Sequence, residues 1–455
     1  MSLRGGTQLW SICRAFLGAR LDPGLGGCYH LVGEHKRPEI DSKEDYHERE
    51  QRAADARPGG GVRRTMNPER FLSSTVGRVL PVSQGEWTYW AFVPHPLPPA
   101  LALDAELVRT LSEADHSLGE LAGLGGAMPN PHLFISPFIR REAVLSSRIE
   151  GTQANLADVY AYEAGQLPLP GLVRPAPPES DVREVVNYVR ALEYGLQRLQ
   201  ALPVSLRLLR ELHERLLQGV RGGQATPGEF RRSQNWIGRP GCTLNEADFV
   251  PPPVTEMHQA LDAFERYLHA PHDYPPLIRL ALMHYQFEVI HPFLDGNGRV
   301  GRLLTSLLLV HWDLLPSPLL YLSAYFERHR QPYYDLLLAV SERGVWREWV
   351  SFFLSGVAGQ ARDAIARARR LQDLQLEWRG RLQQARRSSL CLGLLDWLFE
   401  RPLISANDVR ERFEVSHPTA MQALRRLEAM GFLKEMPGGK RPLRYCASLI
   451  LDLLQ

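Results

Sequence analysis

The amino-acid sequence predicts a mainly α-helical protein that ends in a separate, smaller unit. Three observations support this fold class. Apolar residues recur at near-helical spacing from residue 101 onward, for example at Leu107, Leu111, Leu118 and Leu121. Extended structure is expected near the C-terminus and in residues 228–253, where two short pieces around a glycine-rich turn predict a β-hairpin. Residues 388–455 have a helix, helix, helix, hairpin order of their own.

Composition excludes several classes of protein. The chain has 455 residues, of which 44% are hydrophobic, and this is enough for two or three domains with proper cores. The formal net charge of +2 requires neither a nucleic acid nor a membrane as a partner. The five cysteines form no Cys-x-x-Cys pair, so neither a zinc ribbon nor a disulfide framework is indicated. The apolar run at 303–310 is too short to cross a membrane, and no secretion signal is visible, so we expect a soluble, cytoplasmic protein.

Changes in composition divide the chain into five regions. Residues 1–65 are rich in glycine and arginine and lack periodicity, so we expect them to be disordered or to be a non-native extension before a true start at Met66. A proline-rich break, residues 168–178, ends the next region. We expect an N-terminal helical region, a main helical domain, a solvated connector helix and the C-terminal unit at residues 66–178, 179–355, 356–387 and 388–455 respectively.

The helices follow from the spacing of apolar residues. One helix is predicted from about residue 137 to residue 159, with Glu150 near its middle. The next helix begins at Ser180 or Asp181, either of which can cap it, with Glu184 at capping-box distance. Further helices are predicted at about residues 205–218, 254–269, 275–290, 298–312, 331–342 and 345–385.

Residues 388–455 resemble a winged helix-turn-helix module. Three helices are predicted, at residues 388–400, 405–413 and 416–430. Ser405 is placed to cap the second helix, and Gly431 ends the third. A hairpin follows, because two extended segments flank a Pro-Gly-Gly-Lys turn, at residues 432–434 and 443–445.

Residues 291–302, between two apolar helices, have the composition of a phosphate-binding loop. Gly296 and Gly298 permit a tight loop whose backbone N–H groups are exposed. The next helix begins immediately, so its positive N-terminal end points at this loop. A loop of this kind joined to a helix start binds anionic groups such as phosphate.

Four side chains in the same segment add chemistry to this loop. Arg299 and Arg302 are three residues apart at the helix start, so both project to one side and can fork onto phosphate oxygens. Asp295 supplies a hard oxygen ligand, which suits Mg²⁺ held between one carboxylate and substrate phosphates. His291 can serve as a general base near neutral pH. A base, a metal ligand, an anion site and two arginines together predict phosphoryl chemistry.

Residues 291–302 resemble the signature of the Fic family (filamentation induced by cAMP), His-Pro-Phe-x-[Asp/Glu]-Gly-Asn-Gly-Arg-x-x-Arg, at every fixed position. The stretch from Trp236-Ile237-Gly238 to Pro251 resembles the flap hairpin of this family, which aligns the side chain of the target protein by strand addition. Two aromatic pairs, Tyr325-Phe326 and Tyr333-Tyr334, resemble the stretch that packs on the adenine. The resemblance covers about residues 90–355 and implies a Fic-type helical bundle with a β-hairpin flap.

The resemblance implies a protein adenylyltransferase, which transfers AMP from ATP to a Ser, Thr or Tyr hydroxyl of a target protein. His291 would take the hydroxyl proton, and Asp295 would hold Mg²⁺ on the phosphates. Asn297 and the glycine amides would hold the α-phosphate region, with Arg299 on the loop and β-phosphate and Arg302 on the γ-phosphate. The complete nucleotide site would consist of Gly296, Asn297, Gly298, Arg299, Val300, Gly301, Arg302 and Tyr334.

Two features of the family bear on which reaction is expected. Gly298 favours nucleotidyl transfer over the kinase-like branch, in which a lysine replaces this glycine. Other family members use other nucleotides or phosphocholine, so ATP is the expected donor and not the required one.

The segment from Ser146 to Gly151 matches the inhibitory pattern of the family, [Ser/Thr]-x-x-x-Glu-[Gly/Asn]. Ser146 and Glu150 are four residues apart and are expected to share a helix face. The resemblance implies that Glu150 contacts Arg302 and keeps it from the γ-phosphate of ATP. In some relatives the same glutamate positions a water molecule that removes AMP, so a bifunctional enzyme is left open.

The presumed recognition helix of the C-terminal unit presents polar residues outward, and further positive charge lies near the wing. These residues are His417, Thr419, Gln422 and Arg425 on the helix, and Lys434, Lys440, Arg441 and Arg444 near the wing. They indicate either a DNA-reading surface or a docking domain of the same fold. His213, His258 and His284 are interpreted as ordinary helix residues, with His284 packed near the motif.

Three functions are open at this point: an autoinhibited adenylyltransferase, a transcription regulator whose enzyme half senses a ligand, and a toxin-like member silenced by a partner. The intact motif and the inhibitory pattern within the chain favour the first. A homo-oligomer is also left open, because family members often form dimers or tetramers.

Overall fold

The computed structural model describes most of the chain from Met66 onward. The described residues are 66–84, 87–127, 132–165, 177–220, 225–239, 241–271, 274–385, 389–436 and 443–454. The expected extension at residues 1–65 lies outside them, as do Lys440 and Arg441.

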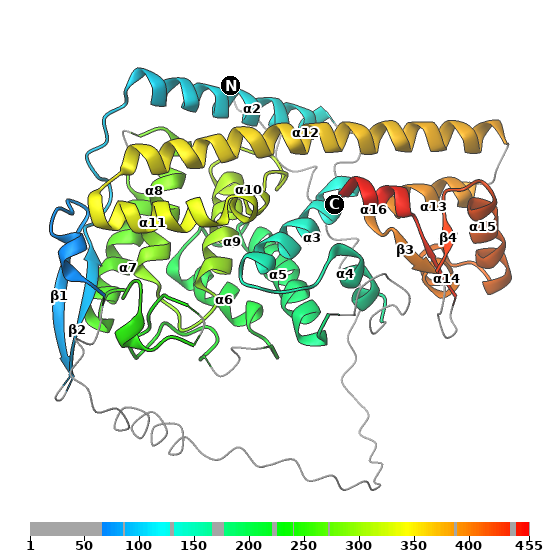
Figure 1. The fold of residues 1–455 in the computed structure, drawn as a ribbon. Helices are drawn as coiled ribbons and strands as arrows, with labels where there is room; N and C mark the ends of the chain where they lie inside the picture. Colours follow the sequence, from blue (N-terminus) through cyan, green and yellow to red (C-terminus); the bar gives the residue numbers. More distant parts are fainter. Residues whose placement is uncertain are drawn as a thin grey trace, which may run out of the picture. The chain divides into compact units, whose positions relative to one another are not determined.

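A group of helices near the middle of the chain forms the core around the motif. Its members are α5 Glu179–Arg198, α6 Leu206–Leu216, α7 Val254–His269, α8 Pro276–Ile290 and α9 Asn297–His311. The last four begin and end within two residues of the predicted positions. α8 is buried from Leu277 to Ile290 except at Arg279, which is half-buried, and α9 packs against it. The loop that carries the motif joins these two helices (Figure 1), so it is held at the end of an almost completely buried helix.

A β-hairpin near the start of the described chain was not predicted from the sequence. β1 Gly77–Gln84 pairs with β2 Trp87–Pro94 in an antiparallel register that sets Gly77 opposite Pro94. The aromatic residues of β2 suit a half-buried strand, and Phe92 packs against Phe249 with ring centroids 5.6 Å apart. The region expected to be helical therefore includes a two-stranded sheet.

The predicted helix at 137–159 is wrong, because two helices separated by a turn occupy this stretch. α3 His132–Ile149 ends before Glu150, and α4 Leu156–Glu163 follows. Gly151 has a φ of +96°, its N–H donates to the carbonyl of Arg148, and the N–H of Thr152 donates to the carbonyl of Ser147. This hydrogen-bond pattern is a Schellman motif, which ends a helix at a glycine. Glu150 therefore lies in the turn after α3 and not in the middle of a helix.

The predicted cap of the next helix is also wrong. α5 begins at Glu179 with Pro178 at the N-cap position, so neither Ser180 nor Asp181 caps it. Asp181 instead accepts a hydrogen bond of 2.8 Å from the backbone N–H of Gln153. Glu184, predicted at capping-box distance, is buried against the motif.

The predicted flap hairpin is present only as a single bridge among the described residues of 225–253. The backbones of Ile237 and Phe249 form an isolated antiparallel bridge, with the Ile237 N–H 2.8 Å from the Phe249 carbonyl. A short 3-10 helix, η3 Leu244–Glu246, lies between them. The consecutive prolines 251–253 remove backbone donors and shorten any further pairing.

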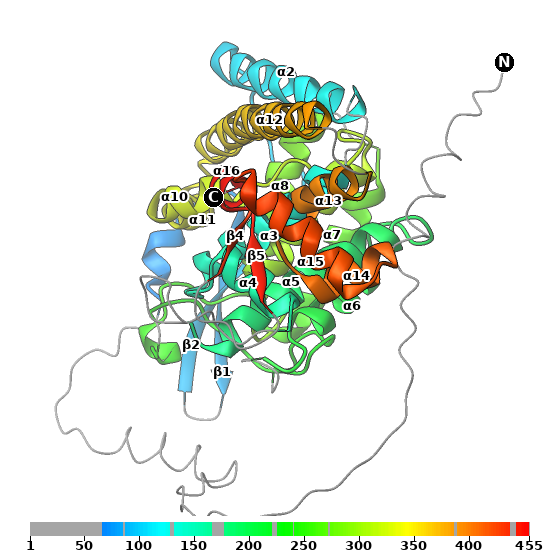
Figure 2. The ribbon, with the colours of Figure 1, turned by 90° about the vertical axis from the view of Figure 1, so that its right-hand side faces the viewer.

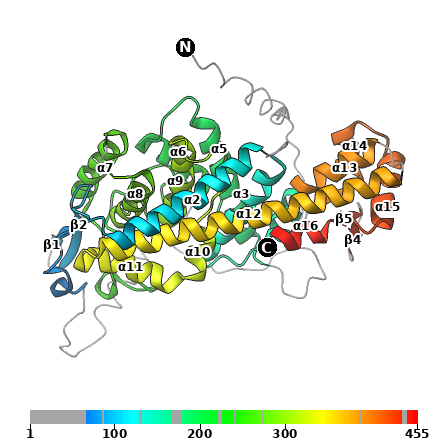
Figure 3. The same cartoon turned by 90° about the horizontal axis from the view of Figure 1, so that it is seen from above.

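The predicted connector helix is part of one continuous helix of 39 residues, α12 Trp346–Gln384. It follows the short helices α10 Ser323–Arg328 and α11 Arg330–Arg343, and it packs along α2 Ala105–Ala127 (Figures 1 and 3). The stretch predicted as a connector is not solvated on every side, since Ala361, Ile365 and Leu371 are buried. Some of its arginines lie on the exposed surface and form ion pairs there, such as Arg362 with Glu113 of α2.

The C-terminal residues adopt the predicted order of helices and strands. The elements are α13 Ser389–Glu400, β3 Leu403–Ser405, α14 Ala406–Phe413, α15 His417–Ala429, β4 Lys434–Glu435, β5 Arg444–Cys446 and α16 Ser448–Leu454 (Figure 2). Ser405 caps α14, and Gly431 follows α15 with a φ of +77°. The three strands form a sheet in the order β3-β5-β4, and β3 and α16 were not predicted.

One residue expected on the wing surface lies elsewhere. Arg444 is 7% exposed, and its guanidinium donates to the carbonyl of Ala164, just after α4. Arg401 likewise donates to the carbonyl of Glu163 at 3.3 Å. Arg444 thus joins the C-terminal residues to the end of α4 instead of adding charge to an exposed surface.

None of the helices in the described part of the chain is long and apolar enough to cross a membrane.

Two glycine substitutions test the origin of the turn at Glu150. Gly151→Ala places a side chain at positive φ, so we expect the free energy of unfolding to fall by about 1–2 kcal/mol. Gly123→Ala, on the exposed face within α2 and with no atom near its added methyl, should raise it by about 0.5–1 kcal/mol. Urea unfolding of both variants measures the difference. A Gly151→Ala protein as stable as the Gly123→Ala protein would contradict the assigned turn.

Candidate active site

His291 sits at the junction between α8 and the motif loop. It ends α8 in the left-handed conformation, with φ of 48° and ψ of 60°, which turns the chain sharply into the loop. Its Nδ1 lies 3.0 Å from the carbonyl oxygen of Glu288. Because a carbonyl can only accept, Nδ1 carries the proton and Nε2 keeps its lone pair. Burial lowers the pKa of His291 to about 4, so the ring is neutral at pH 7 and can accept a proton at Nε2.

The backbone of the motif loop is closed by Asn297. Its Oδ1 accepts from the N–H of Phe293 at 2.8 Å, and its Nδ2 donates to the Phe293 carbonyl at the same distance. Asn297 is 2% exposed. This side chain is therefore occupied by the loop itself, and it differs in this from the phosphate contact that the family resemblance implies.

His213 of α6 contacts the motif loop and links it to Gly228. Its Nδ1 accepts from the N–H of Gly228 at 2.9 Å, so Nε2 carries the proton and donates to the carbonyl of Asp295 at 3.0 Å. The ring stacks on Phe293 with centroids 3.8 Å apart. Burial lowers the pKa of His213 to about 4, so this arrangement is stable as a neutral ring.

Arg231 fixes the other side of the loop. It is fully buried and donates to the carbonyls of His291 (3.0 Å), Ser233 (3.2 Å) and Pro252. Its own N–H donates to the carbonyl of Pro292 at 2.9 Å. A buried guanidinium is tolerated here because several acceptors surround it.

Arg302 is the most heavily engaged side chain of the motif. Its Nη2 lies 2.6 Å from Oε1 of Glu150 and 3.1 Å from the carbonyl of Ser146, and its Nε lies 2.8 Å from the Ser146 hydroxyl. Although Glu150 is in the turn after α3 and not on the helix with Ser146, both reach the same guanidinium. Arg302 is 3% exposed, whereas the side chain of Glu150 keeps 33% of its surface in water.

Gly298 makes room for this ion pair. A Cβ atom at this position would lie 2.5 Å from Oε1 of Glu150 and 2.9 Å from Nη1 of Arg302. Gly301 similarly faces the Glu288 carboxyl, which a Cβ would meet at 2.3 Å. Each of these two motif glycines therefore lies directly against a carboxyl group.

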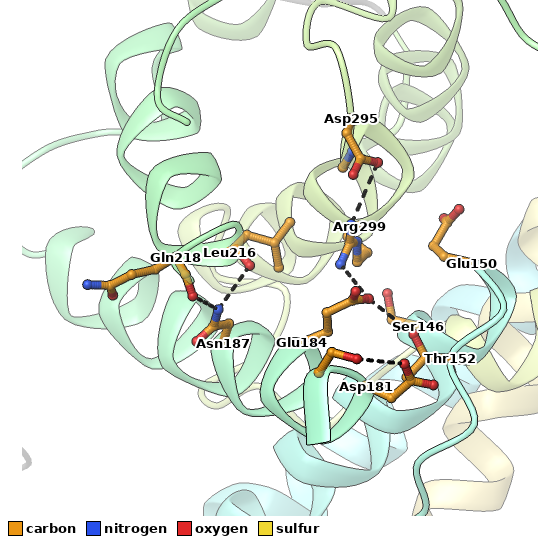
Figure 4. Close-up of polar contacts among 12 residues, drawn as sticks. Ser146, Glu150, Thr152, Asp181, Glu184, Asn187, Leu216, Gln218, Asp295 and Arg299 are labelled. Atoms are coloured by element: carbon orange, nitrogen blue, oxygen red, sulfur yellow. Dashed lines mark hydrogen bonds and ion pairs between the residues drawn. The ribbon is translucent and has the colours of Figure 1, made fainter. Parts of the chain in front are cut away.

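Arg299 lies between two carboxylates, from different parts of the chain (Figure 4). Its Nη1 is 3.2 Å from Oε2 of Glu184 in α5, and its Nη2 is 3.7 Å from Oδ1 of Asp295. Arg299 and Glu184 are almost completely buried, but the side chain of Asp295 is 45% exposed.

Several acids surround the two motif arginines, and their pKa values differ in direction. Burial opposes the charge of Glu150, but the Arg302 guanidinium outweighs burial and holds the pKa of Glu150 below its usual value. Burial raises the pKa of Glu142 and of Glu288 to about 7. Glu150 is thus the ionised partner of Arg302, which fits its short contact.

The start of α9 has the features of an anion site. Gly296 occupies the N-cap position at a φ of +80° and provides no side chain to cap the first N–H groups of the helix. Val300 is fully buried, and its N–H donates to the Gly296 carbonyl, so among the predicted residues it belongs to the core. The open N–H groups of the first turn could hold phosphate oxygens.

Asp295 is the one motif carboxylate that could hold a divalent cation. Its side chain is half exposed at the loop, although Oδ1 also accepts from the N–H of Gly296 at 2.7 Å. The described residues contain no group of three or more His, Cys, Asp or Glu that could hold a metal ion. A single carboxylate fits Mg²⁺ when substrate phosphates supply the remaining oxygens.

The aromatic residues predicted beside the nucleotide divide into core and surface. Tyr333 is buried and its hydroxyl lies 2.9 Å from Nε2 of His284, whose Nδ1 lies 3.1 Å from the Thr305 hydroxyl. Tyr334 is 38% exposed and its ring lies 5.1 Å from that of Tyr333. Of this pair, only Tyr334 has a ring surface available to a ligand.

Sequence reasoning missed three residues that hold the site: Glu184, His213 and Arg231. The sequence predicts capping-box distance for Glu184 and an ordinary helix position for His213. One sequence signal was available for Glu184, since Asp181, Glu184 and Asn187 form a polar stripe at a spacing of three on an otherwise apolar helix face. No local pattern marks Arg231, because its partners are backbone carbonyls, and those of Pro252 and His291 are distant in the sequence.

Comparison with known proteins identifies the domain. Residues 108–197 match the model of the Fic/DOC family N-terminal region, and residues 203–309 match the model of the Fic/DOC family. The chain therefore carries a Fic/DOC family domain together with its family N-terminal region.

Curated relatives and a solved structure agree with this result. The protein adenylyltransferases Fic of Drosophila yakuba and Drosophila ananassae are each 31% identical over 175 residues, which cover 37% of this chain and 31% of the relative. The chain thus matches less than a third of the length of these relatives. A Fic family protein from Desulfovibrio desulfuricans has a similar fold, with a TM-score of 0.50 at 20% identity over 77% of this chain and 98% of that one.

The buried His284 predicts a pH dependence of stability. Burial lowers the pKa of His284 to about 3, so the folded chain keeps this ring neutral while the unfolded chain protonates it below about pH 6.5. The unfolded state then binds more protons, and His284 therefore lowers stability by about 1.4 kcal/mol for each pH unit below that value. Between pH 6 and pH 5, His284→Gln should lose less stability than the wild type by this amount. Parallel stability curves for the two proteins would rule out a buried neutral His284.

Proposed function

We propose that this protein is an autoinhibited protein adenylyltransferase, which transfers AMP from ATP to a hydroxyl side chain of a target protein. The observation that carries the proposal is the contact of 2.6 Å between Glu150 and Arg302, within a complete Fic motif. The curated relatives named protein adenylyltransferase Fic support the same reaction class.

The proposed reaction begins with proton removal by His291. Its Nε2 lone pair accepts the proton of the target hydroxyl, while the carbonyl of Glu288 fixes the tautomer. The hydroxyl oxygen attacks the α-phosphorus of ATP in line, a new P–O bond forms, and the bond to pyrophosphate breaks. The N–H groups at the start of α9 stabilise the charge on the α-phosphate oxygens.

Asp295 is proposed to hold Mg²⁺, which would neutralise charge on the phosphates of ATP. Arg302 is proposed to bind the γ-phosphate, and Tyr334 to pack against the adenine. Asn297 shapes the loop, since both ends of its amide are bonded to Phe293.

The inhibitory role of Glu150 follows from the chemistry of Arg302. Its guanidinium is already bonded to one carboxylate and to both oxygens of Ser146. A triphosphate could bind Arg302 only by replacing Glu150, because a second anion there would repel the first. Removal of AMP by the same glutamate stays a prediction of the resemblance.

We further propose that residues 388–455 form a winged helix-turn-helix module. The element order and the pairing of β4 with β5 support this. The outward residues His417, Thr419, Gln422 and Arg425 are exposed, so contact with DNA stays a prediction, although the burial of Arg444 weakens the expected charge at the wing. A homo-oligomer and a cytoplasmic location also stay predictions.

Removal of the Glu150 carboxylate that occupies Arg302 should raise the adenylyltransferase activity. Glu150→Gly is expected to increase incorporation from α-labelled ATP with Mg²⁺ by about 10- to 100-fold, the range that loss of one charge-assisted hydrogen bond allows. Glu150→Gln, which keeps the shape and removes the charge, should give part of this increase. The double variant Glu150→Gly/His291→Ala should lose the label.

Each outcome of that experiment has a distinct meaning. A label that persists in the double variant would exclude His291 as the base. Folded Glu150→Gly protein that incorporates no label from ATP would contradict the proposed donor, and labelled GTP, CTP and UTP would be tried next.

The low pKa of His291 predicts how kcat/KM depends on pH below neutrality. Because the ring is neutral above about pH 4, kcat/KM of Glu150→Gly should change by less than about twofold between pH 7 and pH 5.5. A base with an ordinary imidazole pKa would lose about tenfold over this range. A pH profile with an inflection near 6.5 would therefore contradict the buried, neutral form of His291.

A further inference from the structure

Three polar residues of α5 lie on one face of the helix and each contacts a different part of the site. Asp181 accepts from the N–H of Gln153, in the turn that carries Glu150, at 2.8 Å. Glu184 lies one turn further along, against Arg299. Asn187 donates to the carbonyls of Leu216 (3.3 Å) and Gln218 (2.8 Å) at the end of α6 (Figure 4). Of the three, only Glu184 contacts the motif directly.

Glu184 contacts Arg299 and the inhibitory turn at the same time. Its Oε2 is 3.2 Å from Nη1 of Arg299 and 3.2 Å from the hydroxyl of Thr152. Thr152 follows Glu150 by two residues and is itself 1% exposed. Both contacts are shielded from water, and a charge without a partner in such a place would be strongly unfavourable.

Arg299 lies near two carboxylates, Glu184 and Asp295, which differ in their exposure to water. Glu184 is 1% exposed, whereas the side chain of Asp295 is 45% exposed and 3.7 Å away. The attraction between charges is stronger where water does not screen it, so Glu184 is the main counter-charge of Arg299. Asp295, four residues before Arg299, is the alternative partner if Glu184 is lost.

We propose that Glu184 is a positioning residue that neutralises Arg299 and so keeps the carboxylate of Asp295 available for a divalent cation on the nucleotide. Without Glu184, the buried guanidinium draws Asp295 onto itself and competes with the cation for the same oxygens. This inference rests on the proposed function, because it assumes that Asp295 is the cation ligand of a nucleotide site.

The experiment measures cation binding directly and does not depend on turnover. Full-length Glu150→Gly protein is saturated with a non-hydrolysable ATP analogue, and Mn²⁺ binding is followed by electron paramagnetic resonance. In this background Glu184→Gln should weaken Mn²⁺ binding by about tenfold or more, as loss of a partner behind a ligand commonly does.

Three matched variants separate positioning from general damage. Asp181→Asn lies one turn away on the same face and does not contact Arg299, so it should leave Mn²⁺ binding unchanged. Thr152→Val removes the other partner of Glu184 and should also leave it unchanged. Glu184→Gln/Arg299→Gln removes both charges and should restore Mn²⁺ affinity at saturating nucleotide, which a purely structural role of Glu184 would not do.

The outcomes test the proposed nucleotide site and the role of Glu184 separately. If Glu150→Gly binds neither the analogue nor Mn²⁺, the proposed nucleotide site is wrong. If Glu150→Gly binds both, but Glu184→Gln binds Mn²⁺ equally well or the double variant fails to restore affinity, only the role given to Glu184 is overturned.

Discussion

The guanidinium of Arg302 lies almost wholly out of water, so it must be bonded to acceptors in every state of the protein. In the structure these acceptors are the hydroxyl and carbonyl of Ser146 and the carboxylate of Glu150. The glycine at position 298 leaves room for the same pair, because a Cβ there would lie 2.5 Å from the Glu150 carboxylate and 2.9 Å from the Arg302 guanidinium, and one of these side chains would have to move. The turn at Gly151 contributes as well, because it brings Glu150 back toward the helix start that carries Arg302. Much of the local architecture therefore follows from satisfying one buried cation.

The site contains several imidazoles and carboxyls whose charge is set by burial. His213 and His284 are kept neutral, and both ring nitrogens of each form hydrogen bonds that link separate parts of the chain. His291 is also kept neutral, and its Nε2 keeps a lone pair that can accept a proton. Glu150 is kept ionised by Arg302, while the pKa values of Glu142 and Glu288 are raised. The neutral His291 and the ionised Glu150 are compatible with the proposed reaction, in which a base is available while Arg302 is occupied by Glu150.

The sequence predicted the fold near the motif well, because the relevant signals are local. Apolar spacing placed α6 to α9 within two residues, and the glycines and charges of 291–302 identified the candidate site. Prediction was poorest where a single backbone angle or a distant partner decides the structure. The positive φ of Gly151 split one predicted helix into two, and Glu184 looked like a capping residue because its partner, Arg299, is 115 residues away. The pairing of β1 with β2 was missed although the sequence carries a two-residue turn signal, Gly85-Glu86, between the two strands. The predicted flap hairpin is a single bridge among the described residues.

The helix that carries Ser146, a partner of Arg302, also contacts the C-terminal residues. α3 packs against α13, and the carbonyls of Glu163 and Ala164 at the end of α4 accept hydrogen bonds from Arg401 and Arg444 of the C-terminal residues. Thermodynamic linkage makes such an arrangement reciprocal. Any molecule that binds the C-terminal residues and prefers one position of α3 must change the free energy of the Glu150–Arg302 contact. A nucleotide that displaces Glu150 must in turn change the affinity for that molecule by the same factor.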